Sequence, residues 1–113
     1  MNILIFGTEK CADTRKARRF FQERRIPAQF RDLAGKPLAE GELKNLCVGG
    51  VRAQDLVDDA GKTFADQGLK WKDYDAAEEL LDHPSLMKTP VIRIDRKVFV
   101  RPDLATLSDA LHD

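Results

Sequence analysis

Apolar and polar residues follow one another along the chain with two different periods, which predict strands in some segments and helices in others. The short apolar run at residues 2–6 predicts a buried strand. From residue 12 to residue 24 the apolar positions recur at intervals of three and four, which predicts an amphipathic helix that ends before Pro27. Residues 28–33 alternate and predict a second strand.

Residues 34–86 carry helical patterns but no strand pattern, so we predict a helical segment here. Helices are expected at residues 39–48 and 52–58, and a third begins at the D-x-x-E capping box formed by Asp75 and Glu78. The residues expected on the inner faces of the first and third helices are Leu43, Leu46, Cys47, Ala77, Leu80 and Leu81.

Strand patterns return near the end of the chain. Residues 90–94 and 97–100 are strand-like and flank a connection of two residues, 95 and 96, which predicts a hairpin. Pro102 then precedes a final helix, whose leucines at helical spacing are Leu104, Leu107 and Leu111. The predicted order is β-α-β, a helical insert, and β-β-α.

The composition is that of one compact globular domain. The chain has 113 residues, of which 42% are hydrophobic and 34% charged, which excludes the disordered class. No apolar run approaches the roughly 20 residues that a membrane span requires, and the apolar start MNILIF lacks the basic flank of a signal peptide. We therefore expect a cytoplasmic protein with no membrane partner.

Charged residues are unevenly distributed although the formal net charge is zero. Residues 1–31 carry eight Lys or Arg against three acidic residues, whereas residues 32–82 carry six against twelve. The zero total argues against general nucleic-acid binding, while the local positive excess around Cys11 could hold an anion. The alternative is a solvated helix face formed by Arg18, Arg19, Arg24 and Arg25.

The chain contains two cysteines, Cys11 and Cys47, too few for a disulfide scaffold in a cytosolic protein. Together with His83 and His112 they lack the spacing of zinc ligands, so we expect no metal site. Cys47 shares a helix face with leucines, which assigns it to the core. A resolving role in thiol chemistry is the alternative for Cys47.

Cys11 stands at the predicted start of the first helix, which makes it the candidate reactive residue. There the positive end of the helix dipole and the backbone N–H groups of the first turn favour a thiolate. The hydroxyl group of Thr14 is a further donor, and Lys10 and Arg15 add positive charge. We therefore predict that Cys11 is a nucleophile near neutral pH. The alternative is a small buried cysteine that starts a helix.

Three short stretches, GTEKCADTRKA, HPSLMKTPVIRI and VFVRPD, occur in this order, and the whole chain resembles the glutaredoxin-coupled arsenate reductase family with its ArsC, Spx and YffB-type members. The resemblance implies an α/β fold with a thioredoxin-like, glutaredoxin-type core. The chain is then a single domain, residues 1–113. Its core comprises residues 1–33 and 87–113, and the helical insert, residues 34–86, lies between the second and third strands.

The same resemblance implies roles for residues around the third and fourth strands. Thr89 and Pro90 are assigned to substrate binding, with a cis peptide bond before Pro90; a proline that merely starts an edge strand is the alternative. Lys10, next to the cysteine, is expected to contribute to substrate binding through its positive charge. Arg101 precedes Pro102 as an arginine does in the family, where it helps to hold an oxyanion. Its guanidinium group also suits a glutathione carboxylate. A salt bridge to an aspartate is the alternative for Arg101.

The resemblance implies a monothiol oxidoreductase with no bound cofactor. Cys11 would attack arsenate or a glutathione mixed disulfide, and glutathione or a glutaredoxin would resolve the product. Thr14 stands where Spx proteins have a second cysteine, and Thr89 stands where arsenate reductases have an arginine. The substrate, arsenate or a disulfide, stays open. The alternative function is an Spx-like non-catalytic regulator that binds RNA polymerase or another protein.

Two aromatic residues of the insert, Trp71 and Tyr74, lie in a segment that loosely resembles the YffB branch. Aromatic rings bury a large apolar area, so core packing is the expected role of both. Lining of the active cleft is the alternative.

Overall fold

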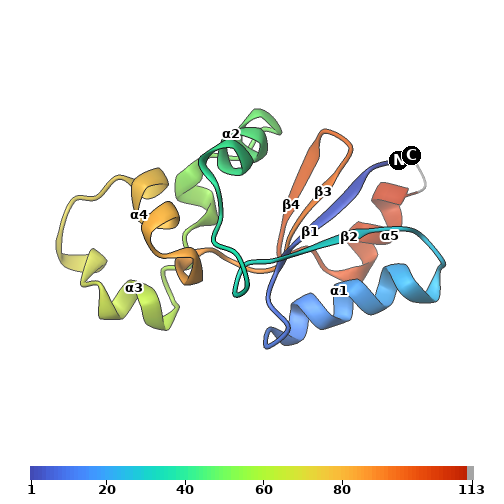
Figure 1. The fold of residues 1–113 in the computed structure, drawn as a ribbon, viewed down its shortest axis with the longest axis horizontal. Helices are drawn as coiled ribbons and strands as arrows, with labels where there is room; N and C mark the ends of the chain where they lie inside the picture. The colour runs from blue at the N-terminus through green and yellow to red at the C-terminus, as the bar shows by residue number, and fades with distance from the viewer. Residues whose placement is uncertain (112–113) are drawn as a thin grey trace. The chain divides into compact units, whose positions relative to one another are not determined.

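The computed structural model describes residues 1–111, which form two compact units (Figure 1). The sheet unit consists of Met1–Asp32 and the segment from Thr89 onward, and the helical unit consists of Leu33–Lys88. Within the described residues no helix has both the length and the apolar character needed to cross a membrane.

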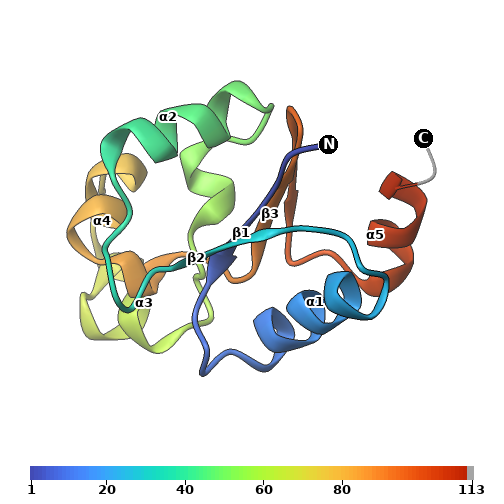
Figure 2. The same cartoon turned by 45° about the vertical axis from the view of Figure 1, so that its right-hand side comes forward.

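The sheet unit is built on four strands, which Figure 2 shows from a second direction. They are β1 (Ile3–Gly7), β2 (Gln29–Asp32), β3 (Val91–Ile94) and β4 (Lys97–Val100), in the order β2-β1-β3-β4. β1 and β2 are parallel, and the other two neighbouring pairs are antiparallel. The hairpin predicted between β3 and β4 is confirmed, because Ile94 pairs with Lys97 across a two-residue connection. The strand order therefore places the start of β3 beside the end of β1.

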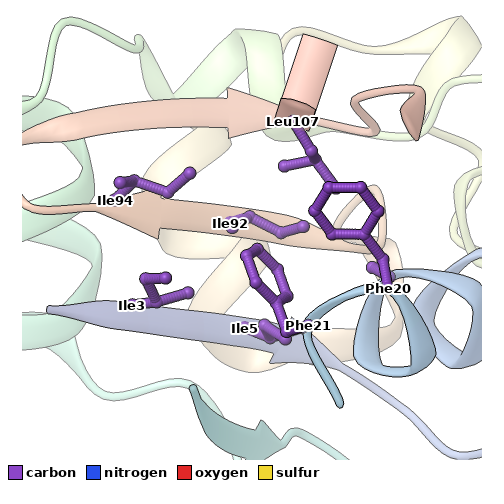
Figure 3. Close-up of a cluster of buried hydrophobic side chains, with 8 residues drawn as sticks. Ile3, Ile5, Phe20, Phe21, Ile92, Ile94 and Leu107 are labelled. Carbon is purple, nitrogen blue, oxygen red and sulfur yellow. The ribbon is translucent and has the colours of Figure 1, made fainter. Parts of the chain in front are cut away.

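Two helices, α1 (Ala12–Glu23) and α5 (Leu104–Leu111), pack on one face of this sheet. Alternate residues of β1 and β3 point to the same face, and the helix residues that meet them recur at intervals of three and four. The rings of Phe20 and Phe21 are arranged edge to face, with their centroids 5.2 Å apart. The buried cluster, drawn in Figure 3, consists of Ile3, Ile5, Ala17, Phe20, Phe21, Ile92, Ile94 and Leu107.

The helical unit contains only short helices. They are α2 (Glu40–Val48), η1 (Ala53–Leu56), α3 (Lys62–Asp66), η2 (Leu69–Trp71), α4 (Ala76–Asp82) and η3 (Pro84–Leu86), where η denotes a 3₁₀ helix. The predicted cap at Asp75 is confirmed, because its Oδ1 accepts a hydrogen bond from the backbone N–H of Glu78 at 3.1 Å. No sequence pattern predicted α3, η2 or η3, since elements of three to five residues are too short to show a period.

Two expectations for the helical unit are wrong. Cys47 is exposed and not part of the core, because α2 buries only Leu43 and Leu46 and ends directly after Val48. Trp71 does not pack in the core either: it is 82% exposed, in a single 3₁₀ turn. Tyr74 is half-buried, and its hydroxyl group accepts a hydrogen bond from Gln54 at 2.8 Å.

Candidate functional site

The candidate site begins at Cys11, the N-cap residue of α1. The loop after β1 and the first turn of α1 each bind its backbone: its N–H donates to the Thr8 carbonyl at 3.2 Å, and its carbonyl accepts from the N–H of Arg15 at 3.1 Å. The Cys11 side chain is half-buried and is a free thiol. The N–H groups of the first helical turn point toward this end of the helix, where they stabilise negative charge.

The pKa of the Cys11 thiol is lowered by its surroundings. Partial burial is the largest single influence and raises the pKa, because it disfavours the charged form. Hydrogen bonds from the side chains of Thr14 and Thr89, and then from the backbone N–H groups of Thr14 and Asp13, act in the opposite direction and together outweigh burial. The positive charges of Lys10 and Arg15 are not among these causes. The site therefore favours a thiolate mainly through hydrogen-bond donors.

Thr14 is a buried polar residue in the first turn of α1, with 0% exposure. Its Oγ1 has no hydrogen-bond partner of standard geometry among the described residues. Thr14 is nevertheless the strongest of the hydrogen-bonding groups that lower the pKa of Cys11. A charged acceptor binds a hydroxyl donor more strongly than a neutral thiol does, so the Thr14 hydroxyl group favours the thiolate even where it makes no standard hydrogen bond to the thiol.

The second part of the site is the segment before β3. The Thr89–Pro90 peptide bond is cis, as predicted. The carbonyl oxygen of Thr89 lies 3.6 Å from the Cys11 sulfur, which donates to it as a thiol. The same oxygen accepts a hydrogen bond from Nε of Arg101 at 3.2 Å. One carbonyl group therefore connects three candidate residues that are far apart in the sequence.

Arg101 follows β4 directly and is exposed. Its φ angle of 46° lies in the left-handed region, which favours glycine, so an arginine at this point costs about 1 kcal/mol or more. Its backbone N–H donates to the carbonyl of Pro90 at 2.8 Å, in addition to the side-chain bond to Thr89. Both bonds tie the end of β4 to the cis segment beside the cysteine.

The remaining two candidates are Arg15, in the first turn of α1, and Lys10, on the loop before this helix. Nη1 of Arg15 donates to the carbonyl of Glu9 at 2.8 Å, so this guanidinium group stabilises the backbone of the loop that precedes the cysteine. Lys10 is exposed and directly precedes Cys11. The structure thus brings Cys11, Thr14, Thr89, Pro90 and Arg101 together and gives Arg15 a contact with the loop backbone.

Comparison with known proteins decides the family. No protein-family profile matches the chain. The global transcriptional regulator Spx 2 of Oceanobacillus iheyensis is 30% identical over 103 residues, which cover 88% of this chain and 75% of that protein. The chain belongs to the ArsC/Spx family.

Solved structures confirm the fold expected for an ArsC/Spx-family chain. A protein named YFFB has a TM-score of 0.84 and 24% identity, with 97% of this chain and 99% of that chain covered. An ArsC-related protein from Brucella melitensis has a TM-score of 0.70 and 27% identity, with 98% and 95% covered. An arsenate reductase from Vibrio cholerae has a TM-score of 0.81 and 18% identity, with 96% and 97% covered. The thioredoxin-like α/β fold predicted from the sequence is therefore confirmed.

One residue near the site was missed when only the sequence was considered. Gly7 lies just beyond the strand predicted for residues 2–6, whereas in the structure it is the last residue of β1 and pairs with Asp32. It lies directly against the side chain of Thr14. A glycine within a strand is a recognised sign of close approach by another group, but the residue type alone does not tell whether a glycine ends a strand or opens a loop.

Potential metal ligands do not gather anywhere in residues 1–111: no group of three or more His, Cys, Asp or Glu side chains could hold an ion there. His83 follows α4 as its C-cap residue, with Nε2 at 3.9 Å from a carboxylate oxygen of Glu79. His112 lies outside the described residues.

The lowered pKa of Cys11 makes the stability of this ArsC/Spx-family protein depend on pH in a defined direction. A thiolate favoured by folding adds stability above the pKa of an unfolded thiol, about 8.5, and this contribution is lost as the pH falls through the folded-state pKa. We expect the free energy of unfolding of the wild type, relative to Cys11→Ser, to increase with pH between these two pKa values. Urea denaturation at a series of pH values measures it. A difference that stays constant across this window would contradict the lowered pKa.

Proposed function

We propose that this chain is a single-cysteine thiol oxidoreductase that uses glutathione, or a glutaredoxin, as its reductant. The observation that carries the proposal is the position of Cys11: its sulfur lies at the start of α1, with a lowered pKa, and 3.6 Å from the carbonyl oxygen of Thr89. A thiolate is the form that attacks disulfides, and a lowered pKa increases the thiolate fraction at any given pH below it. The proposal extends the reductase names of the structural neighbours to this chain, with a cytoplasmic location, where glutathione is abundant.

The reaction proceeds in two exchanges of one thiolate for another. Cys11 thiolate attacks the glutathione sulfur of a mixed disulfide, forms a Cys11–glutathione disulfide and releases the substrate as a thiolate. A second glutathione, as thiolate, then attacks the bound glutathione sulfur, which yields oxidised glutathione and restores Cys11. The released substrate takes up the proton that the second glutathione has lost. The net result is one reduced substrate thiol for each oxidised glutathione.

The residues around the sulfur have distinct tasks in this proposal. Thr14 and the first-turn N–H groups of α1 stabilise the thiolate that attacks in the first exchange and leaves in the second. Arg101 supplies a guanidinium group beside the cis segment, where it can bind a carboxylate of glutathione. Thr89 stands where arsenate reductases of the resembled pattern have an arginine, so we propose a disulfide and not arsenate as the preferred substrate.

The test is a comparison of two substrates under the same reducing conditions. The purified protein is given glutathione with either a peptide–glutathione mixed disulfide or arsenate, and oxidised glutathione is measured by coupling to glutathione reductase. We expect turnover of the mixed disulfide and a far lower kcat/KM for arsenate, with or without added glutaredoxin. Turnover of arsenate alone would contradict the preferred substrate, and turnover of neither substrate would contradict the enzymatic proposal.

Arg101 offers a check within the same assay. Loss of a charged hydrogen bond to the substrate is expected to lower kcat/KM about tenfold in Arg101→Gln. Arg96→Gln is the matched control, because Arg96 is an exposed arginine in the turn between β3 and β4. An equal loss in both variants would show that general positive charge, and not the position of Arg101, matters.

A second candidate function is favoured by the 30% identity to the regulator Spx 2. In this reading the chain is a non-catalytic regulator, and RNA polymerase is the proposed partner. It predicts retention of the partner by Cys11→Ser protein and no thiol turnover by the wild type. A pull-down with purified RNA polymerase, repeated with Cys11→Ser, separates this function from the enzymatic one.

A further inference from the structure

We infer that Gly7 is a positioning residue for the Cys11 thiolate: the missing side chain at Gly7 makes the space in which Thr14 holds its hydroxyl group beside the cysteine. The inference rests on the proposed role of Cys11 as a nucleophilic thiolate. It assigns to Gly7 a function that acts through the side chain of Thr14.

The contact between Gly7 and Thr14 is too close for any side chain at Gly7. A Cβ atom placed there would lie 2.6 Å from Cγ2 and 3.1 Å from Cβ of Thr14, and closer still to Oγ1. All three are atoms near the stiff base of a β-branched side chain, so they cannot move aside as the end of a lysine would. The approach of β1 to the first turn of α1 therefore depends on glycine.

Backbone conformation gives no other reason for a glycine at this position. The glycines with positive φ among the described residues are Gly50 and Gly68, and Gly7 is not one of them. Gly7 pairs with Asp32 as the last residue of β1, a setting in which glycine weakens a strand. Its use here is explained by the space that it leaves for Thr14.

The side chain of Thr14, for which Gly7 leaves space, carries a buried hydroxyl group without an ordinary hydrogen-bond partner in the described part of the chain. Thr14 is fully buried, and its Oγ1 lacks a hydrogen-bond partner of standard geometry among the described residues. Burial of a donor without a partner costs free energy, so such groups call for an explanation. The Cys11 thiolate provides it, because Thr14 is a cause of the lowered pKa and the charged sulfur is a strong acceptor.

A side chain at Gly7 would therefore act on the cysteine through Thr14. The clash can be relieved only by rotation of the Thr14 side chain or by movement of the first turn of α1 away from β1. Either movement displaces the hydroxyl group or the N–H groups that lower the pKa of Cys11. The pKa of the cysteine is expected to rise in both cases.

The experiment measures the pH dependence of Cys11 alkylation by iodoacetamide, in full-length protein that carries Cys47→Ser so that only one thiol reacts. Gly7→Ala and Thr14→Ala are each expected to move the midpoint to higher pH. Below the midpoint, the rate falls about tenfold for each unit by which the pKa rises. The double variant Gly7→Ala/Thr14→Ala is expected to match Thr14→Ala alone, because the hydroxyl group and the two closest contacts are then absent. The contact of 3.1 Å that remains with the Cβ of residue 14 needs a shift of only a few tenths of an ångström. Gly41→Ala is the matched control, since no atom lies within 4 Å of a Cβ at Gly41.

The alkylation midpoints and the folding of the variants decide whether Gly7 positions Thr14. An unchanged midpoint in folded Gly7→Ala, or additive shifts in the double variant, would overturn it. If Gly7→Ala does not fold, recovery of folding in the double variant supports the inference, and failure of the double variant contradicts it. Alkylation does not require turnover, so a wild type that turns over no substrate would count against the proposed function and leave this result standing.

Discussion

Cys11→Ser protein is expected to lose thiol turnover completely, by at least about a thousandfold in kcat, while Cys47→Ser protein keeps the activity of the wild type. A serine hydroxyl group is not ionised near neutral pH, so the hydrogen bonds that lower the pKa of Cys11 have no thiolate to stabilise. The second cysteine, Cys47, is exposed on α2, and the proposed mechanism does not use it because glutathione resolves the intermediate.

The pair of variants separates a one-cysteine mechanism from a two-cysteine mechanism. The rate of glutathione oxidation with a mixed-disulfide substrate is the measurement for both, and circular dichroism establishes that each protein is folded. Under a two-cysteine mechanism, Cys47→Ser would stall after the first exchange and accumulate a mixed disulfide that mass spectrometry detects. That result would require a resolving role for Cys47 and would contradict the proposed use of external glutathione.

Phe21→Ala is expected to destabilise the protein more than any single change at the site. Phe21 is 1% exposed and packs in the cluster that joins α1 to the sheet, with its ring edge to face with Phe20 (Figure 3). Loss of a buried phenylalanine costs about 4 kcal/mol, from lost apolar burial and from the cavity that remains. This is a large part of the roughly 5–15 kcal/mol by which a domain of this size is stable.

Urea denaturation followed by circular dichroism measures this loss. Val48→Ala is the control, because Val48 is 87% exposed at the end of α2, and its free energy of unfolding should stay within about 0.5 kcal/mol of the wild type. A loss below about 1.5 kcal/mol in Phe21→Ala would mean that the cluster is not packed as described. The orientation of α1, and with it the position of Cys11, depends on this packing.

Local patterns in the sequence predicted the sheet unit well. The periods of apolar residues gave β1, α1 and the β3–β4 hairpin to within one or two residues, because each pattern reports which face of an element is buried. Cys11 could be placed at a helix start for the same reason. Its neighbours in space could not be derived from periods, and Thr89 and Arg101 were assigned only through resemblance to a family.

The misjudged residues share a physical cause. The exposure of Cys47 and Trp71 depends on where a short helix ends and on what covers it, and neither is encoded in the spacing of apolar residues. The role inferred for Gly7 depends on the close approach of β1 to the first turn of α1. A glycine permits this approach, but its presence in the sequence does not predict it. Likewise, the left-handed backbone of Arg101 has no signature in the residue type, since most residues with such a φ are glycines.

The exposure of Trp71 has a spectroscopic consequence. The chain contains one tryptophan, and its indole ring is 82% exposed in the helical unit. An indole that already faces water in the native state changes its emission little when the chain unfolds, so intrinsic fluorescence is a poor signal for unfolding of the sheet unit. The fluorescence of Trp71 is instead a sensitive signal for the binding of a partner. A partner that covers this part of the helical unit would shift the emission to shorter wavelength, and no added label is needed.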